Sequence, residues 1–366
     1  MQINLGRCLM QTLSIVVLAF IIAFSGCERV QKELVPATEV MSEETAAGLT
    51  IAAGTPGGSF EPFANAVAGI LMEQHPNGEV SIEPSPGSVE NTRRVHDNPN
   101  YLGLAFAAET YLGYNGMEIF AEEGAKTNVR VVTLLYIAYA QLAVTADSEI
   151  QEFADLGGKN VATGGLGSGT AQTLERLATA AGIWEQITPV YKGGTEGAMA
   201  LQSGEADAFL WLVGIPNDAI RELAASAPIR LLDLDAPAQA AGFYEKYPFY
   251  LSGTIPAGAY GGEEPSDADA LTSITRPLPA EPVNTITMPT LLIAHKDVPT
   301  ETVYNLLNSV YAAAAMQAIM TATQGAAADM TLENAPKAFV TPLHPGASQF
   351  WSEQGVDIPQ QAMPTQ

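Results

Sequence analysis

Short apolar runs alternate with longer amphipathic stretches along most of the chain. The apolar runs are rich in Val, Ile and Leu, and we predict strands at 49–53, 80–83, 102–106, 129–135, 142–145, 160–163, 187–191, 208–212, 229–232 and 290–294. The amphipathic stretches carry apolar residues at helical spacing, and the predicted helices include 62–74, 88–97, 170–181, 195–203, 216–225 and 300–322. This alternation predicts an α/β architecture with mainly parallel sheets.

One strand, glycine turn and helix unit occurs twice. The sequence TIAAGTPGGSF at 50–60 aligns with NVATGGLGSGT at 160–170, so that Gly57 matches Gly167. A predicted helix follows each of the two turns. The repeat therefore predicts two lobes of similar build that face each other.

A third glycine turn, PSPGSVENTRR at 84–94, also places Gly-Ser before a helix. The first N–H groups of a helix lack internal partners and carry the positive end of the helix dipole, so such turns suit an anion. Ser59, Ser88, Ser168 and Thr170 would add hydroxyl donors. The alternative is that each hydroxyl only caps its own helix. Because the pattern occurs three times, we favour a shared anion site.

Motifs of catalysis are missing from these turns. Neither GTPGGSF nor GGLGSGT has the lysine of a P-loop, and the dinucleotide glycine pattern fails at Thr170. No serine-nucleophile motif surrounds Ser88 or Ser168. The histidines lack metal-ligand spacing; they are His75, His96, His295 and His344. We therefore expect no enzymatic activity, no cofactor and no metal.

The N-terminal pattern is typical of export. Arg7 precedes an apolar stretch at 9–24 that ends at Ser25-Gly26-Cys27, the layout of a secretory leader. We predict a lipoprotein-type signal peptide at 1–27, with Cys27 acylated as the first mature residue, and a flexible polar tether at 28–47. The alternative is an uncleaved transmembrane anchor, for which the apolar stretch is short.

Cysteine content and charge narrow the function further. Both cysteines, Cys8 and Cys27, lie in the leader region, so the folded part has no disulfide, thiol nucleophile or cysteine metal site. Asp and Glu number 40 against 16 Lys and Arg, for a net charge of -24. This charge argues against nucleic acid as a partner, because a phosphate backbone requires a basic surface. The acidic residues are dispersed, and we interpret them as a solubility feature.

A series of motifs, in this order, resembles a known family. The motifs are GTPGGSFEP (54–62), PGSVENTRR (86–94), YNG (114–116), GGKNVATGGLGSGT (157–170), GEADAFLW (204–211), GIPN (214–217), ASAPIRLLDLD (225–235), KYPFY (246–250), TIPAGAY (254–260) and PLHPGA (342–347). Over residues 48–355 the chain is similar to the TAXI-type solute receptors of TRAP transporters. The resemblance implies a two-lobed, type II periplasmic-binding-protein fold with a ligand cleft between the lobes.

The resemblance also implies a function. It predicts a periplasmic or extracellular receptor, tethered to the membrane as a lipoprotein, that captures a small carboxylate such as glutamate or a related organic acid for a sodium-coupled TRAP permease. Residues 48–138 and 296–366 would form lobe 1 and residues 139–295 lobe 2, with crossovers near 136–142 and between 250 and 295. We expect a monomer. Two alternatives stay open: an enzyme of periplasmic-binding-protein ancestry and a sensory ligand-binding module.

The predicted ligand site combines the glycine turns with aromatic residues. Helix N-termini and hydroxyls would hold the carboxylate, while Phe106, Tyr136 and Trp211 would shape the rest of the cleft. The complete set is Gly57, Gly58, Ser59, Phe60, Ser88, Asn91, Phe106, Tyr136, Ser168, Gly169, Thr170 and Trp211.

The chain departs from the family pattern at several positions. Phe60-Glu61-Pro62 stands where Tyr-Tyr-Pro is common, and FAA at 106–108 and WLV at 211–213 are more apolar than usual. If these positions line the cleft, its side-chain end is less polar than in a glutamate receptor; otherwise they only repack around it. Glu61 is either solvated or paired, or it holds a ligand ammonium group. Arg93 and Arg94 could hold a ligand carboxylate, but we favour surface ion pairs on this acidic chain.

Overall fold

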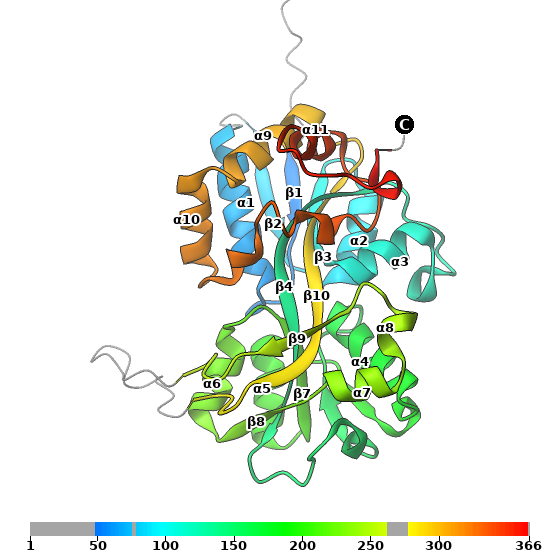
Figure 1. The fold of residues 1–366 in the computed structure, drawn as a ribbon, viewed down its shortest axis with the longest axis vertical. Coiled ribbons are helices and arrows are strands. Elements are labelled where there is room, and N and C mark those ends of the chain that lie inside the picture. The colour runs from blue at the N-terminus through cyan, green and yellow to red at the C-terminus, as the bar shows by residue number, and fades with distance from the viewer. Residues whose placement is uncertain (1–47, 75–77, 262–276, 365–366) are drawn as a thin grey trace, which may run out of the picture. The chain divides into compact units, whose positions relative to one another are not determined.

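The computed structural model describes residues 48–74, 78–261 and 277–364. The predicted signal peptide, the lipidation site Cys27 and the predicted tether lie outside these residues. The described residues belong to one compact unit, in which helices surround a continuous sheet that runs through two lobes (Figure 1).

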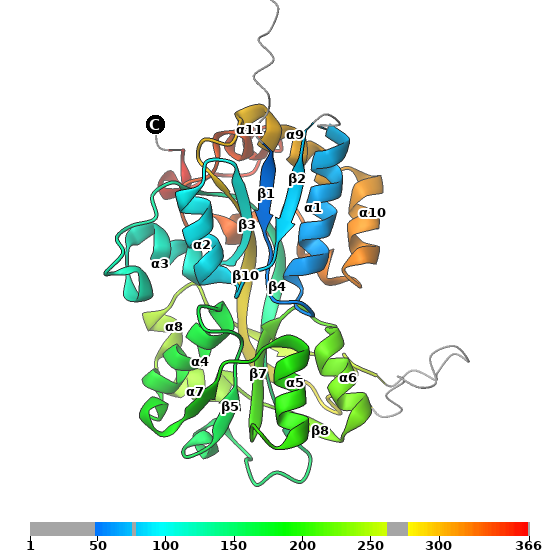
Figure 2. The same ribbon diagram turned by 180° about the vertical axis from the view of Figure 1, so that it is seen from behind.

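The first lobe holds three parallel strands, with β1 (Leu49–Ala52) between β2 (Val80–Glu83) and β3 (Tyr101–Phe106). The turns after these strands lead into helices that begin at the edge facing the other lobe (Figure 2). The helices of this lobe are α1 (Phe60–Gln74), α2 (Ser88–Asp97), α3 (Ala107–Asn115), α9 (Thr300–Val310), α10 (Ala313–Ala322) and α11 (Pro345–Glu353).

The second lobe repeats this construction. Strand β5 (Asn160–Ala162) pairs in parallel with β6 (Thr188–Val190) and β7 (Ala208–Val213). Two further strands, β8 (Ile229–Leu232) and β9 (Leu251–Ile255), lie off this path. The helices are α4 (Gly169–Ala180), α5 (Gly194–Ser203), α6 (Asp218–Ser226), α7 (Asp235–Ala240) and α8 (Phe243–Lys246). Short 3-10 helices complete the chain: η1 (Glu118–Phe120), η2 (Phe153–Leu156), η3 (Trp184–Gln186), η4 (Ala326–Asp329), η5 (Ala335–Ala338) and η6 (Gln360–Ala362).

Two long antiparallel strands, β4 (Val129–Thr145) and β10 (Val283–His295), pass from one lobe into the other. Both are almost entirely buried, which explains their long runs of apolar residues. In the first lobe β10 lies between β3 and β4, and in the second β4 pairs with β7 and β8 while β10 pairs with β9. The order β2-β1-β3-β10-β4, with β10 returning from the other lobe, is that of a type II periplasmic-binding-protein fold. The predicted fold class is confirmed.

Three details of the sequence prediction were wrong. Sheets are mixed rather than mainly parallel, because β4 and β10 run against their neighbours in both lobes. The strands predicted at 129–135 and 142–145 are one strand. Its polar interruption, Gln141, is fully buried and accepts a hydrogen bond of 2.6 Å from the Tyr260 hydroxyl. The helix predicted at 300–322 is two helices, since Ala312 has an extended backbone.

Candidate functional site

A pocket lies where the two lobes meet, at the N-termini of α1, α2 and α4. Its cavity volume is about 30 Å³. The first lobe contributes the turns after β1 and β2 and the end of β3, and the second contributes the turn before α4 and strand β7. The lining residues are Gly54, Thr55, Gly58, Ser59, Phe60, Pro86, Gly87, Ser88, Phe106, Tyr136, Ser168, Gly169, Thr170, Trp211, Leu212 and Val213.

The structure brings most of the sequence-predicted site residues together in this pocket; the exceptions are Gly57 and Asn91. Gly57 lines a neighbouring, more open pocket of about 270 Å³, together with Glu61 and Asp218. Asn91 is fully buried, and its amide nitrogen donates to the carbonyls of Ala53 and Leu104. Asn91 therefore positions α2 against the ends of β1 and β3.

The hydroxyl groups of the pocket accept hydrogen bonds from main-chain amides. Ser168 Oγ accepts from Ala171 N at 3.1 Å and so caps α4. Ser88 Oγ accepts from Phe106 N at 3.1 Å, and Ser59 Oγ accepts from Gly214 N at 3.3 Å. Ser168 thus caps its own helix, whereas the hydrogen bonds of Ser59 and Ser88 connect separate elements. The hydroxyls of Ser88 and Ser168 each keep a proton that they can donate, whereas the Ser59 hydroxyl also hydrogen-bonds the Tyr136 side chain.

Two helix N-termini meet across the pocket. Gly87, with φ +131, precedes α2, and a Cβ on this residue would lie 3.5 Å from Ser168 Cα. Within the described chain, the main-chain N–H groups of Ser88, Val89, Gly169 and Thr170 have no hydrogen-bond acceptor. Unpaired N–H groups and the helix dipole favour an anion at each of these ends.

The pocket lining carries no ionisable acid, Lys, Arg or His side chain among the described residues. Tyr136 is fully buried, and burial raises the pKa of its hydroxyl well above the ordinary value, so this group stays neutral. Phe60 and Phe106 pack edge to face, with ring centroids 5.3 Å apart. An anion here would meet amides, hydroxyls and aromatic rings, without a formal positive charge.

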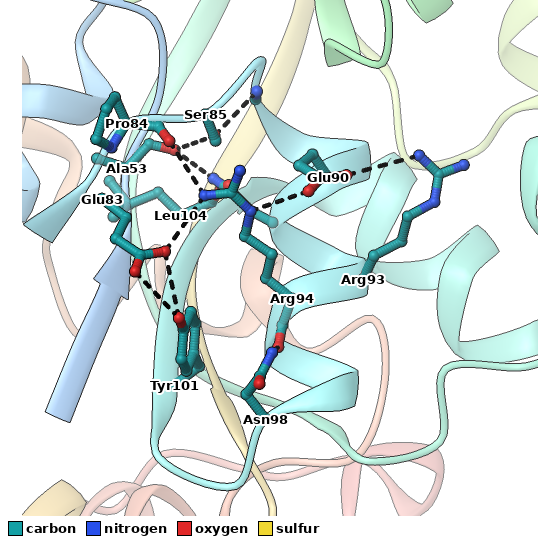
Figure 3. Close-up of polar contacts among 12 residues, drawn as sticks. Ala53, Glu83, Pro84, Ser85, Glu90, Arg93, Arg94, Asn98, Tyr101 and Leu104 are labelled. Carbon is teal, nitrogen blue, oxygen red and sulfur yellow. Dashed lines mark hydrogen bonds and ion pairs between the residues drawn. The ribbon is translucent and has the colours of Figure 1, made fainter. Parts of the chain in front are cut away.

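Arg93 and Arg94 do not line the pocket, and Figure 3 shows their polar contacts with Glu90 and Pro84. Arg93 pairs with Glu123 and Glu90. Arg94 Nε donates to Glu90 Oε1 at 2.9 Å, and its Nη1 donates to Pro84 O at 3.1 Å. These contacts agree with the favoured interpretation of both residues as surface ion pairs.

A charged contact that the sequence analysis missed also joins the lobes. Arg176 of α4 donates from Nη1 to Glu109 Oε1 of α3 at 2.6 Å and from Nε to Glu118 Oε2 at 2.8 Å. Arg176 is 4% exposed and Glu109 is 1% exposed. Burial raises the pKa of the Glu109 carboxyl, and the Arg176 guanidinium opposes part of that rise. A single acid within the apolar sequence LGLAFAAETYLG was the available signal.

The described histidines have structural contacts. His344 accepts from Gly346 N through Nδ1 at 3.2 Å, and burial lowers its pKa to about 4. His96 Nδ1 accepts from Asn128 N at 3.2 Å. Among the residues that the structure describes, no group of three His, Cys, Asp or Glu side chains could hold a metal ion. The described helices are each too short or too polar to cross a membrane.

The fold and this interlobe pocket define a two-lobed α/β protein with a binding cleft. Residues 51–355 match the model of the NMT1-like family, and the chain belongs to that family.

Solved structures with a similar fold include three solute-binding proteins. MatC from Rhodopseudomonas palustris, solved with bound malate, is 14% identical, with 84% of this chain and 98% of that chain covered and a TM-score of 0.48. The aliphatic sulphonate binding protein SsuA from Escherichia coli is 15% identical, with 86% and 95% covered and a TM-score of 0.41. A TctC solute binding protein from Polaromonas is 14% identical, with 78% and 88% covered and a TM-score of 0.40.

Proposed function

We propose that the protein is an extracytoplasmic solute-binding receptor of the TAXI type, which captures a small organic anion and delivers it to a TRAP permease. One observation carries the proposal: unpaired amides at the N-termini of α2 and α4 converge on an interlobe pocket without charged side chains. Such amides bind a carboxylate without a cationic partner. The ordered series of motifs shared with TAXI receptors supports the choice of transporter type.

Capture would proceed by lobe closure. The solute would first bind the α2 amides of Ser88 and Val89, and closure would then bring the α4 amides of Gly169 and Thr170 onto the same group. The present cavity of about 30 Å³ holds roughly one or two water molecules, so an organic acid requires the lobes to be further apart. Lobe 1 would comprise residues 48–138 and 296–366, and lobe 2 residues 139–295, with rotation about β4 and β10.

Binding without turnover follows from the chemistry of the lining. A serine or threonine hydroxyl becomes a nucleophile when a base takes its proton. The hydroxyls of this pocket are instead surrounded by amides, glycines and aromatic rings. We therefore favour a receptor over an enzyme of periplasmic-binding-protein ancestry.

Mass spectrometry of the solute released from purified, denatured protein tests the proposal. We expect a small organic acid, and adding that acid to solute-free protein should raise the melting temperature because it binds only the native state. The acid should be recovered unchanged after prolonged incubation. Its chemical consumption would contradict the receptor function.

Membrane attachment is a separate part of the proposal. A Cys27→Ser variant should leave the membrane fraction or fail to mature, since the acylated thiol would be lost. Attachment of this variant through an uncleaved leader would show that the anchor is a transmembrane helix instead.

A further inference from the structure

Trp211 of β7 has an indole N–H without a partner. The residue lines the cleft pocket and is 6% exposed, and within the described residues Nε1 has no hydrogen-bond acceptor. The other fully buried tryptophan, Trp351, behaves normally, because its Nε1 donates to Val132 O at 3.0 Å. Buried donors are nearly always paired, so the unpaired indole implies an acceptor that the described residues do not supply.

Packing fixes the direction of the indole ring. Its face stacks on Phe209, with ring centroids 6.0 Å apart and an interplanar angle of 22°. Its outer edge lies against Gly193, where a Cβ would come within 2.6 Å of Cζ3 and 2.8 Å of Cη2. Its Cζ2 is 3.4 Å from where a Cβ on Gly58 would lie. Nε1 is on the same side of the ring as Cζ2, and therefore on the side of Gly58, which also lines the pocket.

We propose that Trp211 Nε1–H donates a hydrogen bond to an oxygen atom of the bound solute and thereby selects the solute class. This inference rests on the proposed function and narrows the class of solute that the receptor would bind. The carboxylate is held by the amides of α2 and α4, which meet at Gly87 and Ser168, whereas the indole approaches from the turn at Gly58. Gly58, Gly87 and Ser168 line the same pocket, so a small acid whose second oxygen is next to its carboxylate, such as a 2-oxo or 2-hydroxy acid, would reach both sets of donors.

The same geometry disfavours an amino group at that position. An indole nitrogen is only a donor, and it has no lone pair that an ammonium group could use. A 2-amino acid would place a donor and a positive charge against the indole N–H. The site should therefore discriminate between acids of the same carbon skeleton that differ only at C2.

Calorimetric titration of two matched acid series, with the full mature protein and its Trp211→Phe variant, tests the inference. The three-carbon series is propionate, pyruvate and L-alanine, and the five-carbon series is glutarate, 2-oxoglutarate and L-glutamate. We expect the 2-oxo acid of the series that binds to exceed the unsubstituted acid by about 3- to 10-fold in affinity, the effect of one hydrogen bond, and the amino acid to bind most weakly. Phenylalanine keeps an aromatic ring but lacks the N–H, so the variant should lose this preference.

Indole ¹⁵N NMR of the unaltered protein gives a second readout that needs no variant to fold. On saturation with the 2-oxo acid, the signal of Trp211 should shift and exchange more slowly with solvent, whereas the signal of Trp351 should not change. A 2-oxo preference that persists in Trp211→Phe, or tight binding without a Trp211 shift, would overturn the inference and leave the receptor function standing. Failure of all six acids to bind, together with release of a solute that is not an organic acid from the purified protein, would overturn the proposed small-carboxylate function, and this inference with it.

Discussion

The two glycine turns of the repeat, 54–60 in the first lobe and 164–170 in the second, share a backbone and differ in their surroundings. Gly57 and Gly167 have φ angles of +80 and +83, and each turn leads into a helix. A Cβ on Gly57 would lie 3.2 Å from Thr195 Oγ1 in the opposite lobe, whereas a Cβ on Gly167 would meet nothing within 4 Å. The same local conformation thus faces the other lobe in one case and open space in the other.

The serine residues of the two turns differ in the same sense. Ser59 accepts its hydrogen bond from Gly214, in the other lobe, while Ser168 accepts from Ala171 in its own helix. In the repeat Ser59 aligns with Gly169 and Ser168 with Gly58, so the two serines occupy neighbouring rather than equivalent positions, and only Ser59 bonds to the other lobe. Among the glycines of the second turn, a Cβ would come closest to the other lobe at Gly169.

Gly169→Val should have the largest effect on binding. A Cβ at this position would lie 2.4 Å from Phe106 Cδ2 and 2.9 Å from Glu109 Oε2, both in the opposite lobe. Overpacking costs about 1–3 kcal/mol, so we expect an affinity loss of roughly 10- to 100-fold in calorimetric titration with the identified solute. Gly165→Ala is the matched control, because its nearest neighbour would be Pro86 Cβ at an ordinary 3.7 Å. Equal losses in both variants would contradict an interlobe clash.

Gly58→Val should have the next largest effect. Its Cβ would lie 3.1 Å from Thr55 O within the same turn and 3.4 Å from Trp211 Cζ2. The branched side chain would press on the indole, and we expect the solute to dissociate about 10 times faster, near the middle of the overpacking range. Stopped-flow measurement of dissociation would detect this. Unchanged dissociation would show that the turn does not contact the solute.

Gly57→Ala and Gly167→Ala form a matched pair. Both variants should lose about 1 kcal/mol of unfolding free energy, because both positions have positive φ. Only Gly57→Ala brings a side chain near Thr195 of the other lobe, so only this variant should also weaken solute binding, by roughly 3-fold for a tight contact that can partly relax. Equal binding losses would mean that the two turns are functionally equivalent.

Ser168→Ala should affect stability more than binding. Removing the N-cap of α4 should cost about 1 kcal/mol in urea-induced unfolding of the solute-free protein. Its solute affinity should change by less than about 2-fold, because this hydroxyl mainly caps its own helix. A large affinity loss without destabilisation would show that the hydroxyl contacts the solute directly.

Ser59→Ala should show the smallest effect, and it should change solute affinity rather than stability. Its hydrogen bond with Gly214 N joins the lobes, and at 3.3 Å it is long, so its loss should reduce solute affinity by about 2-fold, at the low end for a neutral hydrogen bond. The stability of the solute-free protein should stay unchanged. Destabilisation equal to that of Ser168→Ala would show that Ser59 also acts locally.

Sequence patterns correctly predicted the elements whose apolar spacing and flanking turns are visible in the sequence itself. The bounds of β2, α2 and β8 agree with the predicted ranges, because their apolar spacing and flanking turns are undisturbed. Helices α3 and α11 were missed, and β9 was missed too, since its residues are mostly exposed and their pattern is not that of a buried strand.

The candidate pocket could be predicted in outline because glycine turns before helices are visible in one sequence. Its tertiary partners could not. The pairing of Arg176 with Glu109 depends on how α3 and α4 meet across the lobes, and no local pattern records that. The unpaired indole of Trp211 likewise becomes visible only when every neighbouring acceptor has been placed.

The continuity of β4 and β10 has an entropic consequence for capture. These strands remain hydrogen-bonded to each other through the crossover, and two register shifts, near Thr290 and Leu292, interrupt the ladder where β10 lies between β3 and β4. Rotation spread over such irregularities changes dihedral angles slightly and orders no loop. Ordering a free residue costs about 1–2 kcal/mol, a cost that this connection largely avoids. Closure would then add little conformational entropy to the translational and rotational cost of binding the solute, and the amides of both strands would exchange slowly with deuterium whether the lobes are open or closed.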